Sequence, residues 1–570
     1  MASQDTGRDS AVQPDDEPGA DRAAQDAQDD HASLDAPAGG DAAPGDAAPG
    51  VVAGRATPAS GGLLRSGMVV SAMTMLSRVL GLARDVTIAA LFGAGSGADA
   101  FFVAFKIPNF LRRLFAEGAF NQAFVPVLSE YASQRTRAEV RELLDAVAGS
   151  LAVVLALMTS LAIVLAPWLA LVFAPGFARD PDKLALTAEM LRLTFPYLLL
   201  ISLTAFSGSV LNTWNRFAVP AFTPVLLNLA LIGAAVALTP WMSVPSMALA
   251  WGVLIAGAAQ LAFQVPFLAR LGLLPRPWPN FRHPGVKRIL WLMAPALFGV
   301  SVSQINLLLD TVLASLLADG SVSWLYYSDR LVELPLGVFG VALGTVILPA
   351  LSKRHAERSP EHFAQMLDWA LRAVLLLGLP AALALEVLAE PLLVSLFHYG
   401  AMTDRDIAMA AMSLRAYALG LVAFMLIKVL APGYFARQDT ATPVKIGVVA
   451  MVANMVFNLA LILPLAHAGL ALATALSAFL NAGLLARGLR RRGVLVFQPG
   501  WGRYALQLLG GCALMTLALW WFAPDWQVWL EWDVWRRAGT LAALVAGGAA
   551  VYFAWLAATG VRLRHFRLRG

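Results

Sequence analysis

Apolar runs of about 18 residues or more recur from residue 64 almost to the end of this chain. A run of that length crosses a hydrocarbon core of ~30 Å as a helix. The chain is 58% hydrophobic and 14% charged, whereas a soluble domain is roughly half apolar and about a quarter charged. We therefore predict an all-α polytopic membrane protein.

The apolar runs predict about 14 transmembrane helices. The predicted segments cover residues 64–92, 98–129, 143–174, 184–213, 217–239, 244–269, 286–317, 322–352, 364–396, 406–434, 442–463, 467–488, 501–523 and 537–560.

The first 62 residues differ in composition from the rest. They contain eleven Asp, one Glu and three Arg, which is a net charge of −9, and they have hardly any aromatic residues. Such a segment buries too little apolar surface to offset the entropy lost on ordering. We predict a disordered, acidic, cytoplasmic extension over residues 1–62, and a regulatory tail is the alternative to a plain solvated one.

Positive charges are concentrated in alternate connections between the predicted helices. If the N-terminus lies in the cytoplasm, most Lys and Arg residues fall on the cytoplasmic side, which is the usual bias of membrane proteins. Both termini are then cytoplasmic. Because topology accounts for the basic excess, we expect no nucleic acid partner. The cytoplasmic connections would include Arg135, Arg137, Arg141, Arg282, Lys287, Arg288, Lys353, Arg354, Arg437 and Lys445.

Part of the sequence is repeated 223–225 residues later. Phe124–Ser129 is echoed by Ile347–Ser352, and Asp85 is echoed by Asp310. A parallel repeat in which both copies keep the same topology is a common plan of alternating-access transporters. A duplicated scaffold that transports nothing is the alternative.

The repeat divides the predicted helices into two lobes. We predict a first six-helix lobe over residues 63–280 (spans 1–6) and a second over 281–495 (spans 7–12). Residues 496–570 would add spans 13–14, two C-terminal helices, and a basic cytoplasmic tail.

Charged residues inside the apolar segments are too many to face lipid, since one charge at the bilayer centre costs roughly 2.5–3.5 kcal/mol. Their spacing places them on single helix faces within residues 77–85, 106–117 and 326–333. We expect these three stripes to line a central, water-filled cavity.

Twelve residues are our candidates for this site. As substrate-binding residues we select Ser77, Arg78, Arg84, Asp85, Asn109, Arg112, Arg113 and Arg330. As gating or ion-pair residues we select Asp99, Glu117, Asp329 and Glu333.

The arginines indicate the chemistry of the ligand. A guanidinium stays charged when partly desolvated, and its fork of donors fits phosphate and carboxylate oxygens. An excess of cations therefore favours an anionic substrate. The alternative is a set of buried ion pairs, such as Arg84 with Asp85, Arg113 with Glu117, or Arg330 with Glu333.

The chain lacks the motifs of an enzyme or of a metalloprotein. It has no nucleophile–base set and no Walker A motif, and its seven His and one Cys show no ligand spacing. We predict no enzymatic activity, no cofactor and no metal site.

Several stretches resemble the MurJ (MviN) family of lipid II flippases. They are Ser77–Asp85, Ala98–Asn109, Leu111–Phe120, Trp324–Arg330 and Leu430–Asp439, and the similarity spans roughly residues 63–565. The resemblance implies the fold of the multidrug/oligosaccharidyl-lipid/polysaccharide exporter superfamily. It also implies a cationic cavity between the lobes and a groove for a lipid tail formed by the two terminal helices.

The resemblance further implies an activity. Lipid II, an undecaprenyl diphosphate that carries the peptidoglycan disaccharide-pentapeptide, would move from the inner to the outer leaflet of the bacterial inner membrane. An ion gradient or the membrane potential would drive it. By motif match, essential arginines of the family would be Arg78, Arg84, Arg112, Arg113 and Arg330, and an acidic residue near the outer gate would be Asp99.

Partners and alternative functions follow from the same resemblance. We expect lipid II and membrane lipid as partners, with cell-wall synthesis proteins as further candidates, and we expect a monomer. The alternatives are an exporter of another lipid-linked oligosaccharide or of drugs, and a non-transporting membrane scaffold for cell-wall synthesis.

Overall fold

The computed structural model describes residues 60–357 and 359–561. Most of these residues are helical and none of them forms a strand, which confirms the predicted all-α class. The acidic extension predicted over residues 1–62 lies outside the described residues, except for its last three. Those three begin the first helix, because α1 starts at Ser60.

The helices up to residue 270 follow the predicted apolar segments. They are α1 (Ser60–Phe92), α2 (Ser96–Leu111), the π-helix η1 (Arg112–Ala119), α3 (Phe120–Gln134), α4 (Arg137–Val164), α5 (Ala166–Phe173), the 3₁₀-helix η2 (Pro175–Arg179), α6 (Pro181–Thr194), α7 (Pro196–Thr213), α8 (Ala218–Ala237), η3 (Thr239–Trp241) and α9 (Met247–Arg270).

The helices after residue 283 also follow the predicted apolar segments. They are α10 (Pro284–Ser315), α11 (Ser321–Pro335), the π-helix η4 (Leu336–Gly340), α12 (Val341–Ala356), α13 (Pro360–Val387), α14 (Ala389–Phe397), α15 (Asp404–Phe435), α16 (Ala441–Arg491), α17 (Trp501–Phe522), α18 (Trp526–Leu530) and α19 (Val534–Ala558).

Nine stretches of the described chain are helical, long and apolar enough to cross a membrane. The predicted first, second, seventh and eighth segments are not among them, and these segments contain the charged stripes and Asp310. The eleventh and twelfth are joined in α16, which changes direction at Ala466 (φ 48°, ψ −128°). The chain is therefore a multi-pass membrane protein, and the count of 14 stays a prediction.

Two π-helices interrupt the segments that hold the charged stripes. η1 begins four residues after Pro108, and η4 begins directly after Pro335. Proline removes a backbone donor and crowds the turn that precedes it, so this crowding lies before each π-helix and does not by itself explain the wider turn. Residues 112 and 336, where the π-helices begin, are equivalent in the two repeats. Short π-segments are rare and are frequent at functional sites.

Two turns also match between the repeats. Asn215 and Gln438 both adopt the left-handed conformation, with φ of 59° and 61°. In each turn the following N–H donates to a carbonyl five residues earlier, that of Leu211 or of Tyr434. Residues other than glycine seldom adopt this conformation, so its recurrence supports a duplicated chain. The lobe boundaries at residues 280 and 495 stay a prediction.

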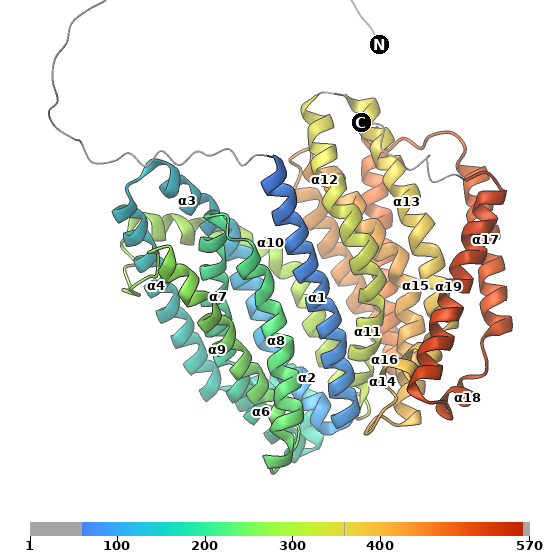
Figure 1. Cartoon of the computed structure of the whole chain (residues 1–570), viewed down its shortest axis with the longest axis horizontal. Helices are drawn as coiled ribbons and strands as arrows, with labels where there is room; N and C mark the ends of the chain where they lie inside the picture. The colour runs from blue at the N-terminus through green and yellow to red at the C-terminus, as the bar shows by residue number, and fades with distance from the viewer. Residues whose placement is uncertain (1–59, 358, 562–570) are drawn as a thin grey trace, which may run out of the picture. The chain divides into compact units, whose positions relative to one another are not determined.

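The helix contacts place the terminal helices beside the second repeat (Figure 1). α17 packs against α13 and α19, and α14 packs against α18 and α19. In the first repeat, α1 packs against α8, and α7 and α8 pack against α9. α10 contacts α3 and η1 as well as α16, so it touches both repeats.

Candidate functional site

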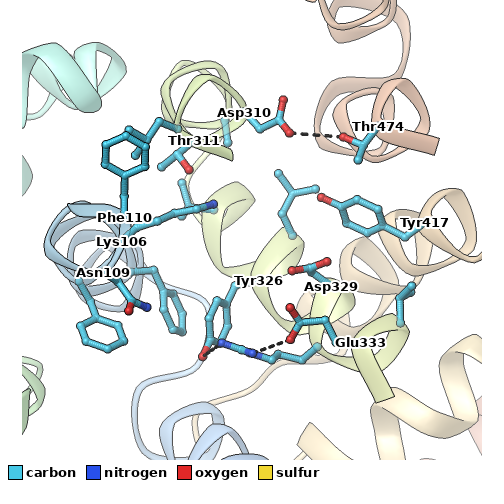
Figure 2. Close-up of a pocket in the computed structure, with 18 of the residues that line it drawn as sticks. Lys106, Asn109, Phe110, Asp310, Thr311, Tyr326, Asp329, Glu333, Tyr417 and Thr474 are labelled. Carbon is cyan, nitrogen blue, oxygen red and sulfur yellow. Dashed lines mark hydrogen bonds and ion pairs between the residues drawn. The ribbon is translucent and has the colours of Figure 1, made fainter. Parts of the chain in front are cut away.

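A cavity of about 320 Å³ lies among α2, α10, α11, α15 and α16 (Figure 2). Aromatic and aliphatic side chains form much of its wall. The polar residues of the wall are Lys106, Asn109, Arg113, Asp310, Thr311, Tyr326, Asp329, Arg330, Glu333, Tyr417 and Thr474.

Two of the predicted stripes meet across this cavity. Lys106, Asn109 and Arg113 come from α2 and η1, whereas Asp329 and Glu333 come from α11. Figure 2 shows Lys106 and Asn109 on one side and the two carboxylates on the other. One wall is therefore mainly cationic, and the other carries Arg330 together with the carboxylates of Asp329 and Glu333.

Arg84 and Asp85 are buried beside the cavity and do not line it. The Asp85 carboxylate accepts hydrogen bonds from Arg84 Nε at 2.9 Å and Nη2 at 2.6 Å. The Tyr326 hydroxyl donates to the same carboxylate at 2.8 Å and accepts from Arg84 at 3.1 Å. Tyr326 does line the cavity, so it connects the buried pair to the open space.

Arg330 contacts the same carboxylate from the other repeat. Its Nε lies 3.4 Å from Asp85, its Nη1 lies 2.7 Å from Glu333, and its guanidinium lies over the Tyr326 ring. Two arginines that are 246 positions apart in the chain thus share one carboxylate. Ion pairing of Arg84 and Arg330, which was the alternative to ligand binding, is present in this conformation.

Asn228 on α8 positions Arg84. Its side-chain oxygen accepts from Arg84 Nη1 at 3.1 Å, and its nitrogen donates to the Ser77 carbonyl at 2.9 Å. Gly81 lies beside this contact, and a β-carbon there would be at an ordinary van der Waals distance of 3.7 Å from the Asn228 amide. Ser77 therefore contributes through its backbone carbonyl.

The other selected residues lie around this centre. Arg112 donates to the Asn109 side chain at 2.8 Å. The Arg78 guanidinium lies against Gly337 in η4, where a β-carbon would overlap it. Glu117 lies in η1, and its side chain is outside the described residues.

Asp99 lies away from the cavity, at the end of α2 where the connection to α1 is tight. It is 1% exposed and accepts from Lys183 Nζ at 3.0 Å, from the backbone N–H of Gly320 at 2.8 Å, and from Ser323 Oγ at 2.6 Å. Lys183 also donates to Asp319 at 2.7 Å. We call Asp99, Lys183, Asp319 and Ser323 the outer lock, because they join α2 and α6 to the start of α11 and because the predicted topology places them on the outer side.

Asp319 lies in the connection between α10 and α11. The hydrogen bond from Lys183 lowers the pKa of this carboxyl below its ordinary value, against a smaller opposing effect of burial. The outer lock therefore keeps a charged Asp319 at neutral pH.

A second polar cluster surrounds Asp310 on α10. Its carboxylate accepts from the amides of Asn458 at 2.8 Å and Asn454 at 3.2 Å, and from Thr474 at 3.3 Å. Both asparagines are fully buried, and their amide oxygens have no hydrogen-bond partner among the described residues. Buried polar atoms are nearly always satisfied, so the two amide oxygens mark this cluster as a polar site within an apolar helix pair.

The donor set of this cluster suits a hard cation. If the two amides turned, both oxygens would join the carboxylate and the Thr474 hydroxyl, and Asn454 would lose its hydrogen bond to the Asn306 side chain; oxygen is the donor that hard cations prefer. Asparagine nitrogen and oxygen are exchanged by a simple flip, so the change needs no backbone movement. Our prediction that the chain has no metal site stays a prediction.

Sequence reasoning missed Lys183, Asn228 and the Asp310 partners, and it placed Tyr326 on a predicted stripe without selecting it as a site residue. Asn454 and Asn458 are four residues apart in an apolar segment, and Asn228 is a single amide in another. Polar residues within such segments are expensive and often functional, so this signal was available. Lys183 gave no such signal, because it precedes an apolar segment.

Comparison with known proteins agrees with this arrangement. The family model described as lipid II flippase MurJ matches residues 88–536. A Vibrio cholerae serotype O1 protein named probable lipid II flippase MurJ is 49% identical over 89% of this chain and 98% of that protein. A Burkholderia cenocepacia protein named lipid II flippase MurJ is 43% identical over 89% of this chain and 99% of that protein.

Solved structures give the same family and a wider fold group. A lipid II flippase MurJ in an inward closed conformation superposes with a TM-score of 0.72, at 26% identity over 86% of this chain and 100% of that one. An inward-facing multidrug resistance MATE family transporter of the MOP superfamily gives 0.62 at 14% identity, over 75% and 97%, which shows a shared fold only. With a family model that covers most of the chain and relatives that match along their whole length, this protein belongs to the MurJ family.

Proposed function

We propose that this protein moves lipid II from the cytoplasmic to the outer leaflet of the bacterial inner membrane. The names of its relatives support the substrate. The observation that carries the proposal is that Arg84 and Arg330, from different repeats, meet at one carboxylate beside a charged cavity. An anion that enters the cavity can take over those two guanidinium groups.

Asp85 acts in this mechanism as an internal substitute for the substrate. Its carboxylate keeps Arg84 and Arg330 oriented while no substrate is bound. A diphosphate offers more oxygens and more charge to the same forks. Arg113 and Lys106 on the opposite wall can then contact the phosphates as well. Substrate binding thus changes the contacts between the repeats.

Movement of the two repeats would expose the cavity alternately to each side. We propose lobes over residues 63–280 and 281–495, with the outer lock closed in the conformation described. Neutralisation of the arginines by the diphosphate would allow the lobes to rock and the contacts of Asp99 to break. This is alternating access about a site near the repeat interface.

The remaining features are assigned as follows. The polyprenyl tail would stay in lipid along α17 and α19, within the terminal part over residues 496–570. Both termini would be cytoplasmic, in line with the distribution of Lys and Arg. The protein would work as a monomer without covalent catalysis, and cell-wall synthesis proteins would use the lipid II that it delivers.

A cation at Asp310 would supply the coupling to a gradient. Asp310, Asn454, Asn458 and Thr474 would hold it, and the unsatisfied amide oxygens support this assignment. Asp310 and Lys106 face the same cavity, so a bound cation would compete electrostatically with Lys106 for the carboxylate.

Charge removal tests the proposal. Arg84→Ala and Arg330→Ala, reconstituted in vesicles, should lower the rate of lipid II flipping at least tenfold, since a hydrogen bond to a charged group contributes about 1.5–3 kcal/mol. Arg330→Lys should recover only part of the rate, because lysine lacks the fork. Arg354→Ala, which removes a cation outside the cavity, is the control. Normal flipping by folded Arg84→Ala and Arg330→Ala proteins would refute the proposal.

A further inference from the structure

A second cavity, apolar and separate from the charged one, lies between α4 and α10. Its volume is about 270 Å³. α4 comes from the first predicted lobe and α10 from the second, so the cavity follows the boundary between them. The side chains that line it include Val147, Leu151 and Leu155 of α4, and Ile289, Met293 and Ala294 of α10.

The mouth of this cavity is preformed. The connection from α9 to α10 runs along α4, and the Asn280 N–H donates to Ser150 Oγ at 3.2 Å, while Ser150 itself lines the cavity. The backbone at Trp278 and Pro279 packs so closely on Gly149 that a β-carbon would not fit there. The segment that borders the opening is therefore held against the helix.

Exposed side chains close in sequence to the lining residues Phe281 and Leu290 suit the headgroup layer of a membrane. Trp278 and Trp291 are 76% and 77% exposed, and indoles favour the boundary between hydrocarbon and water. Arg282 and Lys287 are exposed, and neither forms an ion pair with another described side chain. Arg282 directly follows Phe281, which lines the cavity. An apolar interior thus adjoins two unpaired cations.

We propose that this cavity binds one acyl chain of an anionic phospholipid, whose headgroup phosphate contacts Arg282 and Lys287. Water is a poor occupant, because cavities with apolar walls stay dry. A neutral lipid would fit the apolar walls but would offer no anionic group to Arg282 and Lys287. Since helices of both repeats form the walls, the bound lipid stabilises the conformation described here.

Retention of lipid by the purified full-length protein tests this site. The protein is equilibrated with phosphatidylglycerol or with phosphatidylcholine of the same acyl chains, and the bound lipid is counted by native mass spectrometry. Wild type should retain phosphatidylglycerol in preference. Ala294→Phe fills the cavity and should abolish that preference, whereas Ala513→Phe, the same change on the exposed face of α17, should not. Leu290→Trp at the mouth is a second blocking variant in case Ala294→Phe does not fold.

The charges are tested separately. Arg282→Gln with Lys287→Gln should weaken phosphatidylglycerol binding about 25-fold, at about fivefold for each cation near a membrane surface. Lys445→Gln with Arg490→Gln is the control, because it removes two exposed cations from predicted cytoplasmic connections.

Three results would overturn the proposal. One is equal loss of both phospholipids in Ala294→Phe together with no effect of the charge variant. Another is no difference between any variant and wild type. The third is displacement of phosphatidylglycerol by undecaprenyl phosphate in wild type, which would show that the cavity binds the polyprenyl tail of the substrate. None of these measurements requires flipping, so their outcome is independent of the proposed function.

Discussion

Lys183 and Asp99 form an ion pair of 3.0 Å in which each side chain is only 2% exposed. Asp99 also receives hydrogen bonds from Gly320 and Ser323 at the start of α11. A buried pair costs much of its attraction in desolvation, and removal of one partner leaves an uncompensated charge that costs about 3–5 kcal/mol. The outer lock is therefore sensitive to single substitutions and tolerant of paired ones.

Lys183→Met should open the outer side. The buried Asp99 loses its counter-charge, so conformations that hydrate this carboxylate become favoured. We expect a longer distance between spin labels on Trp241→Cys and Arg405→Cys, measured by double electron–electron resonance in a Cys512→Ser background. Lys183→Arg is the control. The double variant Lys183→Met with Asp99→Asn should restore much of the closed population, and a double variant as open as the single one would contradict this account.

The outer lock should resist mild acid. Lys183 lowers the pKa of Asp319 below its ordinary value of 3.8 by a hydrogen bond. An acid whose pKa is lowered by folding stabilises the folded contact above its ordinary pKa, and this contribution is lost as the pH falls through the lowered value. The spin-label distance should therefore stay constant from pH 7 to 5 and increase only below about pH 4. Asp319→Asn should remove this part of the pH dependence, and an increase near pH 6 would point to another group.

Asn228→Ala should reduce flipping without the loss of any charge. Arg84 would keep its ion pair with Asp85 and would lose the hydrogen bond from its Nη1 to the Asn228 amide oxygen. We expect about a tenfold lower flipping rate in vesicles, at the lower end of the 1.5–3 kcal/mol for a charged hydrogen bond. Gln260→Ala removes a buried amide of α9 that donates to the Thr223 carbonyl and is the matched control. Asn228→Ala should add nothing further to Arg84→Ala, and full additivity would exclude a positioning role.

Sodium should stabilise the protein through Asp310. A ligand that binds only the folded state raises the unfolding temperature as its concentration exceeds its Kd. Thermal unfolding in detergent should shift upward with sodium and less with potassium or choline at equal ionic strength. Asp310→Asn should abolish the shift, whereas Asp329→Asn, a change in the same cavity, should retain it. A sodium-dependent shift that persists in Asp310→Asn would show that sodium binds at another site.

Arg372→Met should loosen the terminal helices. Asp368 accepts from Arg372 at 2.8 Å, from Trp501 Nε1 at 2.6 Å and from the Gln498 N–H at 3.1 Å, and Tyr504 donates to the Arg372 carbonyl at 2.7 Å. Loss of the cation leaves a buried carboxylate. We expect lower thermal stability and faster proteolysis within residues 492–500. Arg503→Met, a nearby exposed arginine, should change neither.

Much of the fold could be predicted from composition and periodicity. The apolar segments coincide with helices, and the stripes that contain Lys106 and Glu333 meet across one cavity. The π-helices could not be predicted, because helical periodicity does not reveal a local change of helix pitch. The break in α16 at Ala466, which has non-helical backbone angles, falls between the predicted segments 442–463 and 467–488.

The partners of the site residues were less predictable. Asn228 contacts Arg84, and Lys183 contacts Asp99, across large distances in the sequence. Such pairs depend on which helices pack together, which no local pattern specifies. The sequence also suggested an unpaired excess of cations, whereas Arg84 and Arg330 are held by Asp85.

The fastening of α19 has a consequence for the biogenesis of this protein. Arg537 is buried and donates to the carbonyls of Trp529, Leu530, Val394 and His398. Val394 and His398 lie at the end of α14, which is synthesised more than 130 residues before Arg537. Until the final helix is inserted, the His398 carbonyl lacks its donor, and a buried acceptor without a donor is unfavourable. Premature termination would therefore leave an incomplete end on an otherwise inserted chain, which membrane quality-control proteases could recognise.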